Sequence, residues 1–212
     1  MAIKNKRILI TAGPTWVPID NVRVISNVAT GETGILLANK LQHLGARVTL
    51  LLGPVGGCCL NKKIKLINFR FFEELKDKII RELKTKKYDA VIHSAAVSDY
   101  RPKKIYSEKL NSGIKNLKLN LAPTEKIIDL IKKINNSLIL VGFKFEAKIS
   151  KRKLIDRTVA LIRRARLDLA VANTINKNGY SSYIIDRSKL HGPLFSKKNM
   201  IDKLVNLIGE NL

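Results

Sequence analysis

Val48-Thr49-Leu50-Leu51-Leu52 is a nearly continuous apolar stretch, and Leu138-Ile139-Leu140-Val141 repeats this pattern later in the chain. Neither stretch shows the regular alternation of apolar and polar residues that marks a strand with one face in water. Such runs are typical of parallel strands that helices cover on both faces. The two stretches therefore favour an α/β fold built on a buried parallel sheet.

Strands and helices alternate around these two stretches. Strands are predicted at residues 7–11, 47–52, 65–69, 90–93, 117–121, 138–143 and 169–172, and helices at residues 31–44, 72–86, 125–135, 151–165 and 197–208. Short strands at 183–185 and 194–195 are expected to be antiparallel. The order predicts a Rossmann-like, doubly wound, mainly parallel sheet with helices on both faces and a short antiparallel C-terminal extension.

The carboxyl ends of the parallel strands are the places to search for a site. Ligands of doubly wound sheets bind in the crevice beyond these ends. In this chain the corresponding loops follow Thr11, His93, Phe143 and Ala172, and they carry the unusual residues of the sequence.

Length and composition indicate one globular unit. The chain has 212 residues, of which 45% are hydrophobic, and we expect a single domain over residues 1–212. No apolar stretch approaches the roughly 20 residues that cross a bilayer. The two cysteines, Cys58 and Cys59, are adjacent, and such neighbours neither bridge without strain nor make a good metal site. We therefore expect a reduced, cytoplasmic protein without membrane contact.

Positive charge is the strongest compositional signal. The formal net charge of +23 predicts attraction to polyanions, which include nucleic acids, acidic membranes and phosphorylated small molecules. The densest basic stretches, at residues 148–153 and at Arg163, Arg164 and Arg166, lack the interleaved aromatic residues of a single-strand binder. We interpret most of the charge as solvated surface. A basic nucleic-acid-binding protein stays an alternative that no recognised motif supports.

The loop after the first strand carries residues suited to phosphate. Thr30 is a good N-cap for the following helix, and Gly31 and Gly34 let the backbone come close, so free amide groups at the helix start can hold phosphate. Arg23 offers a guanidinium that can fork onto phosphate or carboxylate, and Asn27 offers an uncharged donor and acceptor. An ordinary capped helix, in which the glycines serve packing, explains the same residues equally well.

The loop after residues 90–93 begins His93-Ser94-Ala95 and continues to Asp99 and Pro102. Its small residues allow a base or ribose to pack on the backbone, and Asp99 can bond to a sugar or a base. His93 by itself is more typical of strand-end packing than of catalysis. The first strand-to-helix turn has no GxGxxG pattern, which argues against a dinucleotide. An NAD(P)-dependent or other nucleotide-using enzyme on a similar sheet nevertheless stays an alternative.

Six ordered motifs resemble one known family. They are ITAGPT (10–15), PID (18–20), VRVISN (22–27) followed by a GxxG helix start, SAAVSDYRP (94–102), VGFKFE (141–146) and LDLAVAN (167–173). In this order and spacing they resemble the phosphopantothenate–cysteine ligases, which form the synthetase half of the bacterial phosphopantothenoylcysteine decarboxylase/synthetase. The resemblance runs from about Lys6 to the final helix.

The resemblance implies a ligase of coenzyme A biosynthesis. In this family the carboxylate of 4′-phosphopantothenate attacks the α-phosphate of CTP, with Mg²⁺, to give an acyl-cytidylate and pyrophosphate, and the amine of cysteine then displaces CMP. The flavin-binding decarboxylase half is absent from the sequence, so the resemblance implies no FMN here and a separate decarboxylase. It also implies a homodimer, with residues 103–121 as a flexible loop near the dimer interface or covering the site.

The resemblance also assigns roles to single residues. It implies that Asn27 is a catalytic residue that contacts the acyl-nucleotide intermediate. It also implies that Lys109, on the flexible loop, is both catalytic and nucleotide-binding. Arg23, Gly31 and Gly34 would bind the phosphopantothenate side. The remaining nucleotide-binding positions are His93, Ser94, Ala95, Asp99, Pro123 and Phe143. No metal ligand is assigned.

Several positions depart from the family pattern. The family commonly reads SNxSSGxMG, and the segment 28–34 of this chain lacks one of its serine hydroxyls. Glu32 stands where a lysine is usual, and the family's NPDI segment is Ala122-Pro123-Thr124-Glu125 here. The preference for CTP over ATP is therefore open. Leu161 and Ala165 stand at two positions where the family usually has lysines. Our hypothesis is that Arg163, Arg164 or Arg166 supplies the positive charge of the missing lysines. A family member that binds nucleotide without turnover is a further alternative.

Overall fold

The computed structural model describes residues 2–57, 59–177, 179–187 and 189–212. Cys58, for which we expect neither a disulfide nor a metal, lies outside the described residues, and Cys59 is a free, exposed thiol. Across the described part of the chain, no helix is both long enough and apolar enough to cross a membrane.

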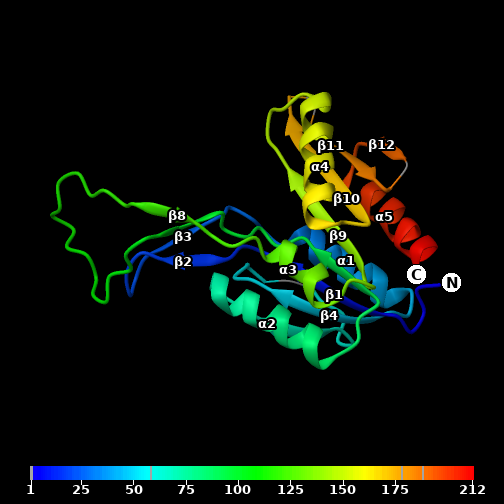
Figure 1. The fold of residues 1–212 in the computed structure, drawn as a ribbon, viewed down its shortest axis with the longest axis horizontal. Coiled ribbons are helices and arrows are strands. Elements are labelled where there is room, and N and C mark those ends of the chain that lie inside the picture. Colours follow the sequence, from blue (N-terminus) through cyan, green and yellow to red (C-terminus); the bar gives the residue numbers. More distant parts are fainter. Residues whose placement is uncertain (1, 58, 178, 188) are drawn as a thin grey trace.

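An eight-stranded sheet runs through the molecule in the order β12-β11-β10-β9-β6-β1-β4-β5 (Figure 1). The strands that pair in parallel are β1 (Arg7–Ala12), β4 (Arg47–Leu52), β5 (Lys65–Asn68), β6 (Ala90–His93), β9 (Ile139–Phe145) and β10 (Leu169–Asn176). The last two strands, β11 (Gly179–Ile185) and β12 (Leu190–Leu194), pair antiparallel at one edge. This arrangement confirms the predicted Rossmann-like sheet and its antiparallel C-terminal extension.

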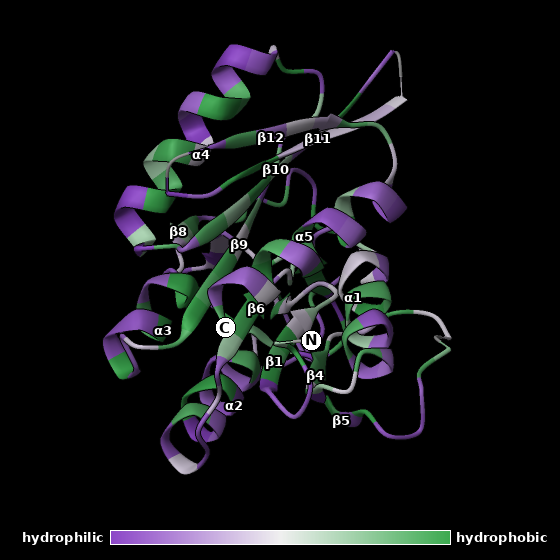
Figure 2. Cartoon of the chain, turned by 90° about the vertical axis from the view of Figure 1, so that its right-hand side faces the viewer, coloured by the Kyte–Doolittle hydropathy of each residue, from purple (hydrophilic) through white to green (hydrophobic). Residues whose placement is uncertain are grey.

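Helices cover both faces of the sheet. One face carries α1 (Glu32–His43) and α5 (Lys197–Asn211), and the other carries α2 (Phe72–Thr85), α3 (Ile127–Ile134) and α4 (Lys151–Ala165). Figure 2 shows the central strands in green, as hydrophobic residues, and purple, hydrophilic residues on much of the outer helix surfaces.

The buried strands explain why the helices form two layers. Ile8 and Ile10 of β1 belong to the core cluster that contains Leu37 of α1, whereas Leu9 between them belongs to the cluster that contains Leu75 of α2. Successive side chains of a strand point to opposite faces, so a strand that is apolar at every position needs a helix on each side. The near-continuous apolar runs of the sequence therefore have a direct structural cause.

The direction in which successive strands are added to the sheet changes between β1 and β6. From β1 the sheet continues to β4 on one side and to β6 on the other, so the carboxyl ends of β1 and β6 flank the topological switch point. In doubly wound sheets, ligands bind in the crevice at this point. The loops after Thr11 and His93, two of the places to search for a site, thus lie together at this point.

Two short strand pairs form an arm that projects from the sheet (Figure 1). They are β2 (Trp16–Pro18) with β3 (Val24–Ser26), and β7 (Tyr100–Pro102) with β8 (Leu121–Pro123). The sequence analysis missed β2, β3 and β7 and placed a strand at 117–121 instead of β8, because three-residue strands are too short to show a period of two. The segment 103–120 closes the far end of the arm.

Candidate active site

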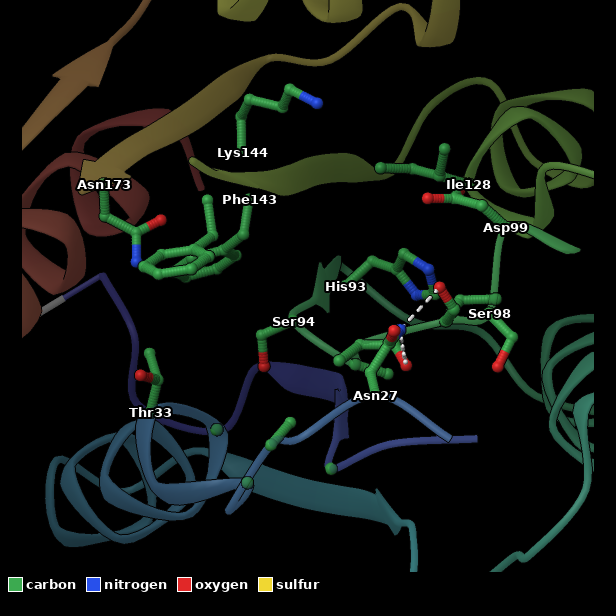
Figure 3. A pocket seen from close by; sticks show the side chains of 18 of the residues that line it. Asn27, Thr33, His93, Ser94, Ser98, Asp99, Ile128, Phe143, Lys144 and Asn173 are labelled. Carbon is green, nitrogen blue, oxygen red and sulfur yellow. Dashed lines mark hydrogen bonds between the residues drawn. The ribbon is translucent and has the colours of Figure 1, made fainter. Parts of the chain in front are cut away.

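A cavity of about 970 Å³ opens at the switch point of the sheet. Its walls come from the start of α1, the loop after β6, the start of α3, the carboxyl ends of β9 and β10, one face of α4 and the start of α5. Of the residues predicted from the sequence, it brings together Asn27, Gly31, Gly34, His93, Ser94, Ala95, Asp99 and Phe143. Figure 3 shows labelled side chains of this wall, with His93 and Asn27 between Phe143 and Asp99.

Hydrogen bonds between β1 and β6 fix the floor of the cavity. The Thr11 hydroxyl lies 2.9 Å from His93 Nδ1 and accepts from the backbone N–H of Ala95 at 3.2 Å, while Ser94 Oγ donates to the Thr11 carbonyl at 2.7 Å. Burial lowers the pKa of His93 to about 4, so this imidazole is neutral near pH 7. A neutral, buried ring held by Thr11 supports the interpretation of His93 as a strand-end packing residue.

Asn27 is tethered to the loop after β6. Its side-chain Nδ2 donates to the carbonyl oxygens of Ala96 and Val97, both at 3.1 Å (Figure 3). Only the NH₂ end of the amide can bond two carbonyls, so the hydrogen-bond network assigns its orientation. Both amide hydrogens are therefore engaged, and donation to a developing oxyanion requires one of these bonds to be exchanged.

The first turn of α1 differs from the predicted cap. Thr30 is not the N-cap; Gly31 occupies that position with φ 72, a left-handed conformation that favours glycine. The Thr30 hydroxyl accepts from the Glu32 N–H at 3.4 Å. Gly34 has a packing role, because a Cβ there would stand 2.4 Å from Ala12 Cβ. The start of α1 thus lies close against β1, and residues 30–34 line the cavity.

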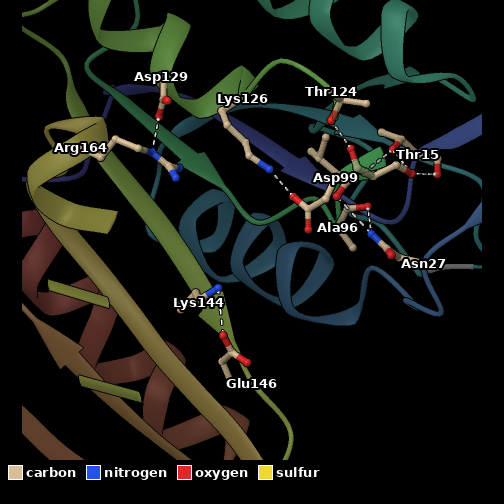
Figure 4. A network of polar contacts seen from close by, with 12 residues as sticks. Thr15, Asn27, Ala96, Asp99, Thr124, Lys126, Asp129, Lys144, Glu146 and Arg164 are labelled. Atoms are coloured by element: carbon tan, nitrogen blue, oxygen red, sulfur yellow. Dashed lines mark hydrogen bonds and ion pairs between the residues drawn. The ribbon is translucent and has the colours of Figure 1, made fainter. Parts of the chain in front are cut away.

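The β6 loop is tied to the start of α3. Lys126 Nζ contacts Asp99 Oδ1 at 2.5 Å, and the Thr124 hydroxyl donates to the Ser98 carbonyl at 2.6 Å (Figure 4). Ser98 is held in turn by its N–H donating to Thr15 Oγ1 at 2.9 Å. Asp99 therefore stands in the cavity beside a cation, with most of its side chain accessible.

Alternate residues of β9 divide the cavity into two sides. Phe143 packs against the core cluster of α1 and α5, and the neighbouring Lys144 projects from the opposite face of the strand. In Figure 3, Phe143 lies with Asn173 and Thr33, while Asp99 and Ile128 lie on the far side of Asn27. We call these the α1/α5 side and the α3/α4 side of the cavity.

Basic residues gather on the α3/α4 side. The α4 residues that line the cavity are Arg157, Ala160, Leu161 and Arg164, which have the spacing of one helix face. Arg164 Nε pairs with Asp129 at 3.2 Å, and Arg157 and Lys144 share Glu146 at 2.8 and 3.1 Å. Figure 4 shows the Arg164–Asp129 and Lys144–Glu146 contacts. Of the three arginines suggested as replacements for the missing lysines, Arg164 lines the cavity, whereas Arg163 and Arg166 do not.

Arg23, Lys109 and Pro123 do not line the cavity in this structure. Arg23 Nη1 donates to Asp20 Oδ2 at 3.0 Å and to the Leu110 carbonyl at 3.1 Å, in the arm. Burial by itself would raise the pKa of Asp20, but the N–H groups of Leu110, Val22 and Arg23 and the Arg23 charge outweigh it and lower that pKa to about 2. Asp20 and Arg23 thus anchor the loop next to Lys109.

Sequence reasoning missed Lys126, Arg157, Asn173 and Lys197 as residues of the cavity wall. The i, i+3, i+4, i+7 spacing on α4 could have found Arg157, but nothing in the sequence places the first residue of α5 beside the first residue of α1. Among the described residues, no group of three or more His, Cys, Asp and Glu side chains could hold a metal.

The fold is that of a Rossmann-like α/β protein, in which a helix start and several cations meet at the switch point of the sheet, an arrangement suited to a phosphate-bearing ligand. Within this class, the chain belongs to the family described as DNA/pantothenate metabolism flavoprotein C-terminal domain, whose profile matches residues 3–210.

Similar proteins agree with this assignment. The coenzyme A biosynthesis bifunctional protein CoaBC of Thermococcus kodakarensis is 41% identical over 180 residues, which are 84% of this chain and 43% of that protein. The chain thus spans less than half the length of this curated relative. A crystal structure of the C-terminal domain of CoaBC superposes with a TM-score of 0.81 at 25% identity, covering 99% of this chain and 97% of that domain. A Cab2 mutant in complex with phosphopantothenate-cysteine has a TM-score of 0.78 at 18% identity, covering 98% and 87%, and shows the fold alone.

Proposed function

We propose that this chain is a phosphopantothenate–cysteine ligase that joins 4′-phosphopantothenate and cysteine through an acyl-cytidylate, using CTP and releasing CMP and pyrophosphate. The observation that carries the proposal is the cavity itself, in which the tethered Asn27 and the start of α1 lie between a basic side and an apolar side. Membership of the family and the similarity to CoaBC support it.

The nucleotide would occupy the α3/α4 side. Its triphosphate would contact basic side chains there, those of Lys126, Lys144, Arg157 and Arg164. Such cations stabilise phosphate oxygens by charge-assisted hydrogen bonds. Base and ribose would pack on the small residues after His93. Pro123 lies beside this region at the end of β8 and would act through the backbone of the loop that leads to α3.

Mg²⁺ fits this arrangement as a partner of the triphosphate. Magnesium in nucleotide sites is commonly held by one or two carboxylates together with substrate phosphates. Asp99 and Glu125 are the carboxylates on this side of the cavity, and they would hold the ion. The ion would supply positive charge against the phosphates.

The reacting groups would meet near Asn27. The phosphopantothenate carboxylate must reach the α-phosphate, and N–H groups at the start of α1, around Gly31 and Gly34, are suited to hold that phosphate. Asn27 would exchange one carbonyl partner for the oxyanion that forms when the amine attacks the acyl carbon. The arm, with Arg23 and Lys109, would bring further positive charge to the substrate.

We also propose the assembly that the resemblance implies. The arm exposes apolar side chains, including Val22, Ile105, Ile114 and Leu117, as a homodimer interface would require. A flavin-dependent decarboxylase would convert the product. We place the reaction in the cytoplasm.

A nucleotide binder without turnover is the second candidate. It is favoured by Glu32, which puts a carboxylate into the first turn of α1, where phosphate would otherwise meet only N–H groups. Both candidates bind the nucleotide, but only the ligase converts it to CMP and pyrophosphate.

Pyrophosphate release tests the proposal. Purified protein is given 4′-phosphopantothenate, cysteine and Mg²⁺ with CTP or ATP, and the Asn27→Asp variant is measured beside it. The ligase should release pyrophosphate with CTP, and the variant should lose about a hundredfold or more, because a carboxylate cannot donate to the two carbonyls or to an oxyanion. Asn199→Asp, on the exposed start of α5, is the matched control. Nucleotide binding without any release from the wild type would favour the second candidate.

A further inference from the structure

The first residues of α1 and α5 form an ion pair inside the cavity. The Glu32 carboxylate and the Lys197 ammonium contact each other, and both residues line the cavity wall. Their side chains are 52% and 37% exposed, so a ligand can reach both groups. The two helices are also joined by Lys40 and Asp202, at 2.8 Å, and by the apolar core between them. The contact of α1 with α5 therefore does not depend on the Glu32–Lys197 pair.

The two sides of the cavity differ in how many cations they offer. The α3/α4 side is lined by four cations, those of Lys126, Lys144, Arg157 and Arg164, which pair with Asp99, Glu146 and Asp129. On the α1/α5 side, Glu32 and Lys197 contribute one charge of each sign. A polyphosphate can contact several cations on the first side, whereas on the second side it would find one cation and face the Glu32 carboxylate. The second side instead suits a ligand that carries one positive and one negative group.

The surroundings of the pair are apolar and aromatic. Phe143, Phe145, Ile175 and Tyr180 line this side of the cavity, together with the amide of Asn173. Figure 3 shows Asn173 beside the Phe143 ring, above Thr33 of α1. Aromatic rings make favourable contacts with sulfur, so this side suits a sulfur-containing side chain.

We propose that Glu32 and Lys197 bind an amino acid as its zwitterion, with the α-carboxylate on Lys197, the α-ammonium on Glu32 and the side chain against Phe143. This inference rests on the proposed function, in which the amino acid is cysteine, and it assigns the part of the cavity that cysteine enters. The ligand exchanges an existing ion pair for two new ones, so neither protein charge is left without a partner. The amine is thereby brought into the cavity that contains Asn27.

A comparison of cysteine with cysteamine tests the Lys197 contact. Cysteamine has the amine and the thiol but lacks the carboxylate. The wild type should use cysteine with a kcat/KM about tenfold above that of cysteamine, because one partly exposed charge contact distinguishes them. Lys197→Met should lower the value for cysteine to that for cysteamine and leave cysteamine unchanged. Lys198→Met, at the next and exposed position of α5, should keep the tenfold preference.

A second variant tests Glu32. Glu32→Gln should raise the KM of cysteine and of cysteamine by about the same factor, roughly fivefold, because both carry the ammonium. The KM of CTP should stay within twofold of the wild type. If Lys197→Met and Glu32→Gln change the KM of CTP and leave the preference for cysteine intact, the pair serves the nucleotide and the proposal is wrong.

Direct binding separates this proposal from the ligase proposal. Saturation-transfer NMR measures cysteine and cysteamine on the full chain, with and without CTP and 4′-phosphopantothenate, and needs no turnover. Weaker cysteine binding in Lys197→Met, restored in Lys197→Arg, supports the zwitterion site even if the chain shows no ligase activity. Equal binding of cysteine and cysteamine to the wild type overturns it. Thermal melting of each variant checks that the fold is retained.

Discussion

Replacing Arg164 by alanine should raise the KM of CTP about tenfold. The guanidinium lines the α3/α4 side of the cavity, its side chain is 50% exposed, and it pairs with Asp129 at 3.2 Å. A charge-assisted hydrogen bond contributes roughly 1.5–3 kcal/mol when well shielded, and an exposed ion pair less than about 1 kcal/mol. A half-exposed contact with a triphosphate lies between these limits, near 1.4 kcal/mol, which is a factor of about ten.

The same reasoning extends to Arg157 on the preceding turns of α4. Arg157→Ala alone should also raise the KM of CTP about tenfold. Because both arginines would contact the same triphosphate, the double variant should raise the KM more than either single variant but less than the product of the two. Both effects should shrink at high salt, because added ions screen exposed charges.

Arg163 and Arg166 provide matched controls on the same helix. Both are exposed and neither lines the cavity, so Arg163→Ala and Arg166→Ala should change the KM of CTP less than twofold. The assay is pyrophosphate release at varied CTP with 4′-phosphopantothenate and cysteine saturating. Equal effects of Arg164→Ala and Arg163→Ala would refute the reasoning, because they would show a general effect of net charge rather than a contact in the cavity.

Three further changes test other parts of the structure. Because His93 stays neutral in the native protein down to about pH 4 while the unfolded chain takes up a proton below about pH 6.5, stability should fall by about 3 kcal/mol across this window. Denaturant titrations at pH 7 and pH 4 should show a loss that is about 3 kcal/mol larger in the wild type than in His93→Gln, because protonation of carboxylates affects both proteins equally. Gly34→Ala should lower the Tm by roughly 5 °C, because its Cβ would lie 2.4 Å from Ala12 Cβ and α1 must shift, whereas Gly56→Ala, with open space around it, should not. Asp20→Asn should speed trypsin cleavage at the lysines of the 103–120 segment, since the carboxylate that accepts from Leu110 and pairs with Arg23 is gone; an unchanged digestion rate would contradict the anchoring role.

The parallel sheet could be predicted because its strands are buried on both faces. The apolar runs at Val48 and Leu138 mark β4 and β9, and the strand at β6 and the helix at α4 begin and end where the sequence indicates. The C-terminal strands are longer than predicted. β11 starts at Gly179, and its first half was not predicted because polar residues such as Ser181 and Ser182 give no apolar strand pattern there. The arm was missed because hydrogen bonds between residues far apart, such as Tyr106 to Ile19, hold it and leave no local period.

The site was predictable where one loop carries several of its residues. Asn27 and the segment from His93 to Asp99 come together because two neighbouring strands end at the switch point. Arg23 was expected beside the substrate, but the sequence could not show that Asp20, three residues earlier, pairs with it in the arm. Lys197 was not expected at all, because its place depends on how α5 packs against α1. Long-range packing decides these positions, and a single sequence does not reveal it.

Product analysis tests the central claim most directly. The protein is incubated with 4′-phosphopantothenate, CTP, Mg²⁺ and isotope-labelled cysteine, and the nucleotide and pantothenate products are identified and counted by mass spectrometry. The account predicts one labelled phosphopantothenoylcysteine for each CMP and each pyrophosphate. No CMP should be released when cysteine is omitted, and the rate of product formation should fall about a hundredfold or more in Asn27→Asp. Formation of CDP and phosphate in place of CMP and pyrophosphate, or no labelled product at all, would contradict it.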